Sequence, residues 1–244
     1  MILSFLQWNV LYKEKPANII KLLEELKPDV FTLQELTAGF AIHNEKDVAA
    51  YIAKELSYNY YAKLSIGSSD KSNEKFGNGI FTHFPIINSG FQWINEYDSR
   101  IVKGYDNEHK AYVEITIDVN GREVTIGTVH MSYTDRFINY SRKKKEADNL
   151  LNIIDAKESN YIISGDFNSR PNSYTVKNIS RRLKHAGPQF KHKTWTTKPF
   201  TYRGFEERDL NWRLDYVFTS SDIKVVSSEI ISTCLLYTSD AADE

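Results

Sequence analysis

Five short segments, widely separated along the chain, carry the polar side chains that metal-dependent cleavage of a phosphodiester would need. They are Gln7-Trp8-Asn9, Leu33-Gln34-Glu35, Thr128-Val129-His130, Gly165-Asp166-Phe167-Asn168 and Arg213-Leu214-Asp215-Tyr216. Such a reaction must neutralise a charged phosphoryl group, orient a water molecule in line, and stabilise the leaving oxygen. Each segment follows or ends an apolar run typical of a strand, so a folded sheet would bring all five to one rim.

The residue types also divide the work of such a reaction. Glu35 and Asn9 offer a carboxylate and an amide carbonyl, the hard oxygen ligands that suit a Mg²⁺ ion retaining several waters. Asp166 and Asn168 flank one phenylalanine, so both side chains would point the same way in an extended segment. Taken singly, these residues are common in caps and turns. Their joint order along the chain favours the catalytic interpretation.

Two further residues are candidates for handling protons. His130 ends a strand pattern and can donate or carry a proton near neutral pH, although an isolated histidine is more often structural. Asp215 could orient a catalytic group, or it could simply pair with Arg213 or with a backbone amide. We expect both to be functional because they belong to the ordered set of segments.

The first elements that the sequence predicts would place Asn9 beside Glu35. Residues 4–10 fit a strand, residues 16–27 a helix with one apolar face, and residues 29–35 a second strand. A strand, a crossover helix and a parallel strand form a right-handed unit. We therefore expect Asn9 and Glu35 at the same sheet edge.

Later patterns predict both helices and strands. The expected elements are a helix over residues 47–56, strands over 58–66 and 79–84, a hairpin of strands 111–119 and 122–131, a helix over 139–156 and a strand over 161–163. The alternation favours an α/β fold, a four-layer sandwich of two mixed sheets flanked by helices. A fully parallel open sheet is the alternative, and the hairpin signal Asn120-Gly121 argues against it.

Composition bounds the class of protein. The chain has 244 residues, of which 41% are hydrophobic, and we expect one domain with a sizeable core. The formal net charge of −1 does not suit a protein that holds nucleic acid by bulk electrostatics, so phosphate binding must be local. The single cysteine, Cys234, excludes an intrachain disulfide framework. We expect a cytoplasmic protein, because the first residues lack signal-peptide features and no apolar run reaches about 18 residues. We also expect a monomer.

Two basic segments allow a functional or a structural interpretation. Residues 191–212 combine lysines and arginines with aromatic rings, so Trp195, Arg203 and Trp212 could stack bases or line a substrate mouth. Tryptophans are also good core residues, which leaves both interpretations open. Residues 142–145 read Arg-Lys-Lys-Lys on a helix whose opposite side is apolar, and we expect a solvated face rather than a phosphate grip.

Taken together, these segments resemble the endonuclease/exonuclease/phosphatase superfamily, a Mg²⁺-dependent group that includes DNase I, abasic endonucleases, sphingomyelinases, inositol phosphatases and deadenylases. The most diagnostic stretches are Leu33-Gln34-Glu35, Ser164-Gly165-Asp166-Phe167-Asn168 and Trp212-Arg213-Leu214-Asp215-Tyr216. The stretch Gly77-Asn78-Gly79-Ile80-Phe81 also resembles the central strand of this family. The resemblance spans nearly the whole chain and implies a DNase I-like fold.

The resemblance implies a role for each site residue. Glu35 would be the principal Mg²⁺ ligand, with Mn²⁺ as a substitute ion, and Asn9 would be an accessory ligand. Asp166 and Asn168 would orient the attacking water and a phosphate oxygen. Asp215 would brace a catalytic histidine.

The resemblance leaves the substrate open. His130 matches DNase-like and sphingomyelinase-like members, whereas residues 212–216 favour the abasic endonucleases. Asn78 would contact the substrate from the central strand. We expect an endonuclease or exonuclease acting on nucleic acid. The alternatives are a lipid or inositol phosphate phosphodiesterase or phosphatase, and a non-catalytic member that binds nucleic acid or protein.

The end of the chain departs from the family pattern. Members carry a Ser-Asp-His triplet about two dozen residues after the stretch that matches 213–216, and this sequence has none. Residues 234–244 resemble a translated sequencing-library adapter, so we expect a domain over residues 1–233 that lacks its last strand and terminal histidine and is catalytically impaired. Residues 227–231 would then have lost a sheet neighbour. The alternative is a genuine short acidic tail.

Overall fold

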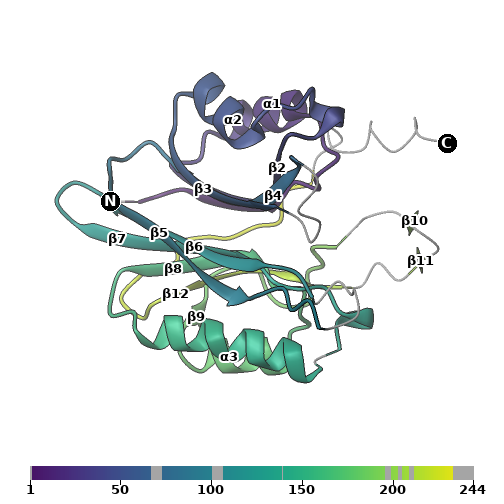
Figure 1. Cartoon of the computed structure of the whole chain (residues 1–244). Helices are drawn as coiled ribbons and strands as arrows, with labels where there is room; N and C mark the ends of the chain where they lie inside the picture. Colours follow the sequence, from purple (N-terminus) through teal and green to yellow (C-terminus); the bar gives the residue numbers. More distant parts are fainter. Residues whose placement is uncertain are drawn as a thin grey trace.

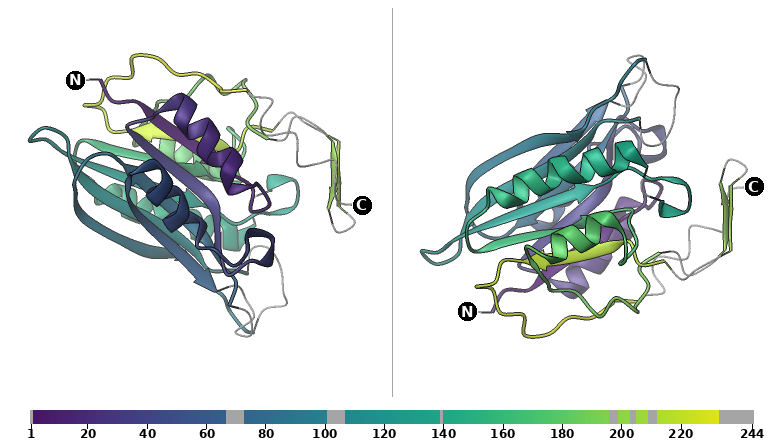
Figure 2. Two further views of the ribbon diagram at one scale, coloured as in Figure 1. Left: turned by 90° about the horizontal axis from the view of Figure 1, so that it is seen from above. Right: turned by 90° about the horizontal axis from the view of Figure 1, so that it is seen from below.

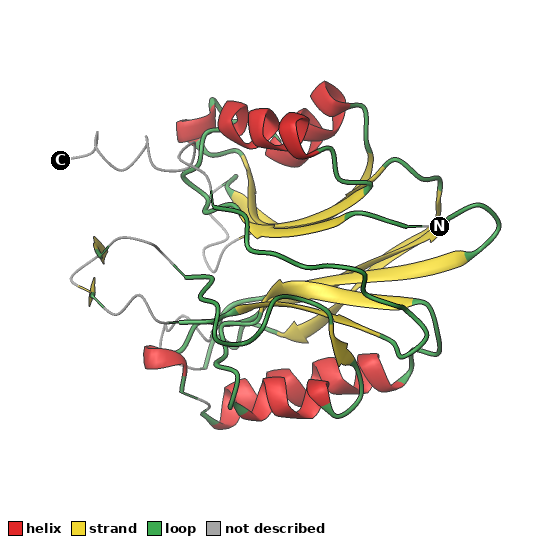
Figure 3. Cartoon of the chain, turned by 180° about the vertical axis from the view of Figure 1, so that it is seen from behind, coloured by secondary structure: helices red, strands yellow, loops and turns green. Residues whose placement is uncertain are grey.

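Two β-sheets pack face to face, with helices on their outer faces (Figures 1 and 3). The computed structural model describes residues 2–66, 73–100, 107–138, 140–195, 199–202, 205–208 and 212–232. Both sheets mix parallel and antiparallel neighbours. The predicted four-layer α/β sandwich is confirmed, and the fully parallel alternative is excluded.

The first sheet has four strands in the order β1-β2-β4-β3. Its strands are β1 (Phe5–Asn9), β2 (Val30–Ala38), β3 (Asn59–Ile66) and β4 (Lys75–Thr82), and its helices are α1 (Pro16–Leu26) and α2 (Val48–Leu56). β1 and β2 run parallel, as the sequence predicts, and Asn9 lies opposite Gln34, next to Glu35. Both helices cover the outer face of this sheet, as the view from above shows (Figure 2).

The second sheet has six strands in the order β5-β6-β7-β8-β12-β9. Its strands are β5 (Ile86–Asn95), β6 (Lys110–Asp118), β7 (Glu123–His130), β8 (Tyr161–Asp166), β9 (Lys184–His185) and β12 (Asp215–Thr219). The helices α3 (Ser141–Asp155) and α4 (Tyr174–Ser180) lie against it. Short elements complete the described fold: η1 (Ala41–His43), η2 (Asp135–Phe137), β10 (Phe200–Tyr202) and β11 (Phe205–Glu207).

Apolar side chains fill the spaces between the layers. Buried residues such as Val113, Ile115 and Ile126 pack between the two sheets. A second cluster, with Phe31 and Ile52, lies between the first sheet and its helices. The third cluster fills the space between the second sheet and its helices α3 and α4. Burial of this surface at roughly 25 cal/mol per Å² is the main force that holds the rim in place.

Several elements are missing from the sequence prediction. β5 carries exposed residues over 87–89, so it lacks the apolar alternation that marks a half-buried strand. α4 has seven residues, too few for a clear helical period.

Residues 227–231 lie outside any strand. Residues 233–244 lie outside the described part of the chain, so the expectation about the tail stays a prediction.

One expectation about α3 is wrong for a single residue. Lys144 and Lys145 are exposed, as expected of a solvated face, but Lys143 is completely buried. Its position on the helix turns it toward the sheet, three residues before the buried Glu146. Four consecutive basic residues look alike in the sequence. Side-chain direction rotates by about 100° per residue along a helix, so one of the four can point inward.

Candidate active site at the rim between the two sheets

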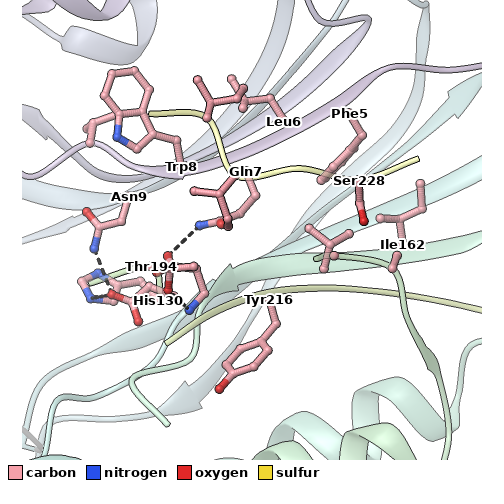
Figure 4. A pocket seen from close by; sticks show the side chains of 18 of the residues that line it. Phe5, Leu6, Gln7, Trp8, Asn9, His130, Ile162, Thr194, Tyr216 and Ser228 are labelled. Atoms are coloured by element: carbon pink, nitrogen blue, oxygen red, sulfur yellow. Dashed lines mark hydrogen bonds and ion pairs between the residues drawn. The ribbon is translucent and has the colours of Figure 1, made fainter. Parts of the chain in front are cut away.

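The ends of four strands and an irregular part of a fifth bring the polar segments together at one rim. In the second sheet His130 lies opposite Asp166, and Asp166 lies opposite Asp215. In the first sheet Asn9 is the last residue of β1. The rim opens into a cleft of about 2080 Å³ whose walls include Asn9, Glu35, His130, Asp166, Asn168 and Asp215. Figure 4 shows Asn9 pointing from one sheet toward His130 on the other.

Glu35 reaches the rim through an irregularity in β2. The ladder between β2 and β4 shifts register between Leu33 and Leu36, which is a β-bulge, and Glu35 has a left-handed φ of 63°. A carboxylate oxygen of Glu35 accepts a hydrogen bond from Asn9 Nδ2 at 3.0 Å, and the other accepts from the Tyr12 amide at 3.0 Å. The bulge and these two donors fix the direction of the carboxylate.

Asn9 links the two sheets. The same Nδ2 also donates to Asp166 Oδ2 at 3.1 Å. His130 Nε2 lies 3.9 Å from Glu35 Oε1 and 3.8 Å from Asp166 Oδ2. The His130, Glu35 and Asp166 side chains are only 12%, 14% and 5% exposed. Four of the predicted site residues therefore form one compact cluster that is almost shielded from bulk water.

Asp166 and Asn168 lie close together, but the segment between them is not extended as the sequence predicts. Asn168 is left-handed, with φ of 44°, so the chain turns after Asp166. The Asn168 amide donates to Asp166 Oδ1 at 2.8 Å, which orients that carboxylate. Asn168 Nδ2 donates to the Met131 carbonyl at 2.8 Å and ties this turn to the end of β7.

Asp215 is held by polar neighbours from two directions. Its Oδ1 accepts from Gln7 Nε2 at 2.9 Å, and Gln7 also donates to Gln34 Oε1 at 2.8 Å. Thr194 Oγ accepts the backbone amide of Asp215 at 3.0 Å. Arg213 donates to the backbone carbonyl of Asp215 at 2.7 Å. The sequence patterns predict no role for Gln7, Gln34 or Thr194.

Burial sets the charge state of the cluster. Loss of hydration raises the pKa of Glu35, although the bonds from Asn9 and Tyr12 oppose this effect. Burial, and then the charge of Asp215, raises the pKa of Asp166 to about 8. Burial also raises the pKa of Asp215 to about 6. Three acidic groups thus gather where negative charge is poorly solvated. A bound cation would stabilise their charged forms.

His130 has the opposite shift. Burial, followed by the positive charge of Lys110, lowers its pKa well below the usual range for histidine. Its Nδ1 atom is buried and has no hydrogen-bond partner within the described residues. The imidazole is therefore neutral at pH 7 and can act as a donor or acceptor, but not as a standing positive charge.

The residues present suit a metal ion with few protein ligands. No group of three or more His, Cys, Asp or Glu side chains forms a complete metal site in the part of the chain that the structure describes. Glu35 and Asn9 instead offer one carboxylate and one amide oxygen, a donor set that Mg²⁺ accepts when waters complete its octahedron. The unbalanced charge of Glu35, Asp166 and Asp215 fits the same ion.

The residues that the sequence predicts for substrate binding lie in different surroundings. Trp195 lines the cleft, and its ring packs edge-on against Phe137 with ring centroids 5.6 Å apart. Trp212 packs on Phe137 as well and lies beneath the Arg170 guanidinium at 4.1 Å. Arg203 lies outside the described residues.

Asn78 is not among the residues that line the cleft. It is buried on β4 and donates from Nδ2 to the Ala111 carbonyl of β6 at 3.2 Å, which joins the two sheets. Its role in substrate binding stays a prediction.

Comparison with known proteins identifies the class. The chain matches the model of the endonuclease/exonuclease/phosphatase family over residues 6–240 and therefore belongs to that family, whose members are hydrolytic enzymes that include nucleases, phosphodiesterases and phosphatases and generally use divalent metals. A search of curated proteins gave no match.

Solved structures share the fold at low sequence identity. The human Nocturnin catalytic domain with bound sulfate is 18% identical with a TM-score of 0.62, over 90% of this chain and 83% of that one. D. rerio TDP2 in complex with a single-stranded DNA product is 18% identical with a TM-score of 0.63, over 90% and 84%. A mannosyl-6-phosphatase of Bacteroides thetaiotaomicron is 17% identical with a TM-score of 0.61, over 91% and 86%. None of the described helices is long and apolar enough to span a membrane.

Proposed function

We propose that this protein is a Mg²⁺-dependent phosphodiester hydrolase that acts on nucleic acid. The observation that carries the proposal is the meeting of Asn9, Glu35, His130 and Asp166 in one shielded cluster across the two sheets. Residues from strands far apart in the sequence converge there, and an isolated cap or turn residue has no reason to do so. The membership in a family of hydrolases supports the same class of reaction.

The geometry suggests a division of labour. Glu35 and Asn9 would hold the ion, which when bound polarises a phosphoryl oxygen and offsets its charge. Asp166, with one oxygen fixed by the Asn168 amide, would orient the attacking water and accept its proton, a role that a raised pKa suits. His130, kept neutral by burial, would donate a hydrogen bond to a phosphate oxygen.

Asp215 would act more indirectly. It accepts one hydrogen bond from Gln7 and lies opposite Asp166 in the ladder, where its charge contributes to the raised pKa of that residue. Removal of the Asp215 charge would therefore weaken Asp166 as a proton acceptor. The predicted bracing of a histidine by Asp215 stays a proposal.

The walls of the cleft favour nucleic acid over a small phosphate ester. Tyr12, Phe76 and Trp195 line the cleft together with Lys110 and Lys193, so its wall offers both aromatic surfaces and cations, the combination that stacks bases and holds phosphates. The structural similarity to D. rerio TDP2 with a DNA product is consistent with this choice. Lipid and inositol phosphates are the alternative substrates.

The test is a substrate panel measured with metal and with chelator. The purified chain is incubated with supercoiled plasmid, single-stranded oligonucleotide, sphingomyelin and an inositol phosphate, each with Mg²⁺, Mn²⁺ or EDTA. We expect nucleic acid cleavage that EDTA abolishes and that Glu35→Gln abolishes as well. Glu25→Gln, on the exposed face of α1, is the matched control and keeps full activity.

Each other outcome of the panel decides against part of the proposal. Cleavage that persists in EDTA would refute the metal dependence. Turnover of sphingomyelin or inositol phosphate alone would assign the alternative substrate. Oligonucleotide binding without turnover, unchanged by Glu35→Gln, would assign the non-catalytic interpretation.

A further inference from the structure

Lys143 is a lysine whose side chain is completely buried beneath the candidate active site. It lies on α3 directly before the exposed Lys144 and Lys145, yet its side chain is 0% exposed. Removing an ammonium group from water costs several kcal/mol unless hydrogen bonds and an opposite charge compensate. Burial lowers its pKa to about 8, while the charge of Glu146 opposes that shift. The site must therefore supply strong partners.

The partners of Lys143 are two backbone carbonyls and one buried carboxylate. Its Nζ donates to the Ser132 carbonyl at 2.6 Å and to the Phe167 carbonyl at 3.0 Å. Glu146 Oε2 lies 3.9 Å away, and Glu146 Oε1 accepts the Ser132 amide at 2.9 Å. Lys143 and Glu146 thus bond to the carbonyl and the amide of Ser132, respectively, and Lys143 also bonds to the carbonyl of Phe167.

These carbonyls belong to the two segments that carry the catalytic candidates. Ser132 follows His130 by two residues, and Phe167 lies between Asp166 and Asn168. The Met131 amide donates to the Asp166 carbonyl at 2.9 Å, so the two segments are already joined at their base. Lys143 adds a second connection between them, deeper in the fold.

We propose that Lys143 and Glu146 form a positioning pair that sets the separation of His130 from Asp166 and Asn168. The inference rests on the proposed function, because it assigns a purpose to the spacing of those residues. The ammonium group draws the end of β7 and the turn after β8 toward one point. This clamp keeps His130 Nε2 at 3.8 Å from Asp166 Oδ2. Lys143 touches neither substrate nor metal.

The clamp predicts a change in kcat rather than in KM. In Lys143→Met the carbonyls lose their donor, and a displacement of about 1 Å at the rim can lower kcat about 100-fold. We expect KM to change less than about threefold, because the cleft walls stay in place. Lys144→Met, one residue along the same helix and exposed, is the matched control and keeps wild-type kcat.

A double variant separates positioning from stability. Lys143→Met alone leaves Glu146 buried without its cation, so a loss of activity could reflect poor folding. Lys143→Met/Glu146→Gln removes both charges. We expect it to regain most of the lost thermal stability while kcat stays low, because methionine cannot donate to the two carbonyls. Recovery of kcat together with stability would overturn the proposal.

Amide hydrogen exchange gives a readout that does not depend on turnover. We expect the amide hydrogens of Met131 and Asn168 to exchange faster in the double variant. The Met131 amide donates to Asp166 from the end of β7, and the Asn168 amide donates to it from the turn after β8. The Val113 and Ile115 amides in β6 should exchange as in the wild type. Unchanged exchange at Met131 would overturn the positioning role. If the wild type hydrolyses nothing in the panel, the proposed function fails, whereas the exchange result still decides whether the clamp exists.

Discussion

The two sheets deliver their catalytic candidates to the rim in different ways. The six-stranded sheet presents His130, Asp166 and Asp215 at the ends of regular ladders, where each lies opposite another. The four-stranded sheet presents Glu35 from a bulge, in a left-handed backbone conformation. The first arrangement depends on ladder register and on the backbone contacts that join the strand ends, such as the bond from the Met131 amide to the Asp166 carbonyl. The second depends on local strain that the surrounding ladder has to sustain.

The difference shows which part of the site tolerates change. A residue at a ladder end can be replaced by one of similar shape without moving the strands, because the backbone bonds fix its position. A residue on a bulge is held by fewer ladder bonds, so its side chain depends more on its own hydrogen bonds, here from Asn9 and Tyr12. The following predictions test this contrast, beginning with the largest effect.

Asp166→Asn should separate activity from stability most clearly. The substitution keeps the shape but removes the proton acceptor, and we expect the rate to fall about a thousandfold. The ladder should survive, because the bonds between β7, β8 and β12 are backbone bonds. Steady-state kinetics at saturating Mg²⁺ measures the loss. A variant that retains activity would remove Asp166 from the mechanism.

The same variant has a predictable effect of pH on stability. The folded pKa of Asp166, about 8, lies above its ordinary value of 3.8, so the metal-free fold binds more protons than the unfolded chain between these values. Wild-type stability should therefore fall as the pH rises through this window. Asp166→Asn should flatten the fall, as thermal unfolding in EDTA at pH 5 and pH 9 would show. Equal slopes would contradict the assignment.

Two glycines test the ladder and the bulge at a smaller scale. A Cβ on Gly165, whose φ is 143°, would meet the Val129 carbonyl oxygen at 2.0 Å in the six-stranded sheet. A Cβ on Gly77, opposite the bulge, would meet the Lys63 carbonyl oxygen at 1.9 Å. We expect Gly165→Ala and Gly77→Ala each to cost about 3 kcal/mol of unfolding free energy.

The contrast lies in their effects on metal binding. Gly77→Ala should also weaken Mg²⁺ binding, measured by calorimetry, because relief of the clash with β3 would shift Gly77 relative to Leu36 and so disturb the bulge that aims Glu35. Gly165→Ala should leave the bulge intact. Gly90→Ala on β5, where a Cβ meets nothing within 4 Å, is the control and should fold normally. Equal loss of Mg²⁺ affinity in both glycine variants would contradict the contrast.

The sequence predicts the positions of His130 and Asp166 at strand ends better than it predicts the position of Glu35 on the bulge. The apolar run before Gly165 and Asp166, and the hairpin pattern before His130, locate the strand ends because the side-chain period of a strand is visible in the letters. The bulge at Glu35 leaves no such pattern, since one extra residue looks like a continuation of β2. The motif identified Glu35, but only the register shows how it is aimed.

Buried polar contacts lie beyond prediction for a related reason. Gln7 shares a strand face with Asn9, two residues on, which was a signal that could have marked it. Lys143 carried no such signal, because its neighbours are also basic and only the helix position distinguishes it. The fold class follows from alternating patterns, whereas these contacts depend on how two sheets and a helix meet in three dimensions.

The smallest predicted effect lies at the outer edge of the six-stranded sheet. His185 on β9 packs against Phe190 with ring centroids 4.3 Å apart, and burial lowers its pKa to about 4. The unfolded chain therefore binds more protons between this value and the ordinary 6.5, so stability should be complete above pH 6.5 and decline as the pH falls toward 4.

Because this histidine is only partly buried, we expect the decline to amount to about 1 kcal/mol after screening by solvent. Urea unfolding of the wild type and of His185→Gln at pH 8 and pH 5 measures it, and the variant should lose less stability between the two. His185 is not among the residues that line the cleft, so the proposed hydrolytic activity at pH 8 should be the same in both proteins. A variant with the full acid sensitivity would place the titrating group elsewhere, and the sheet edge would then contribute nothing to the pH response of the fold.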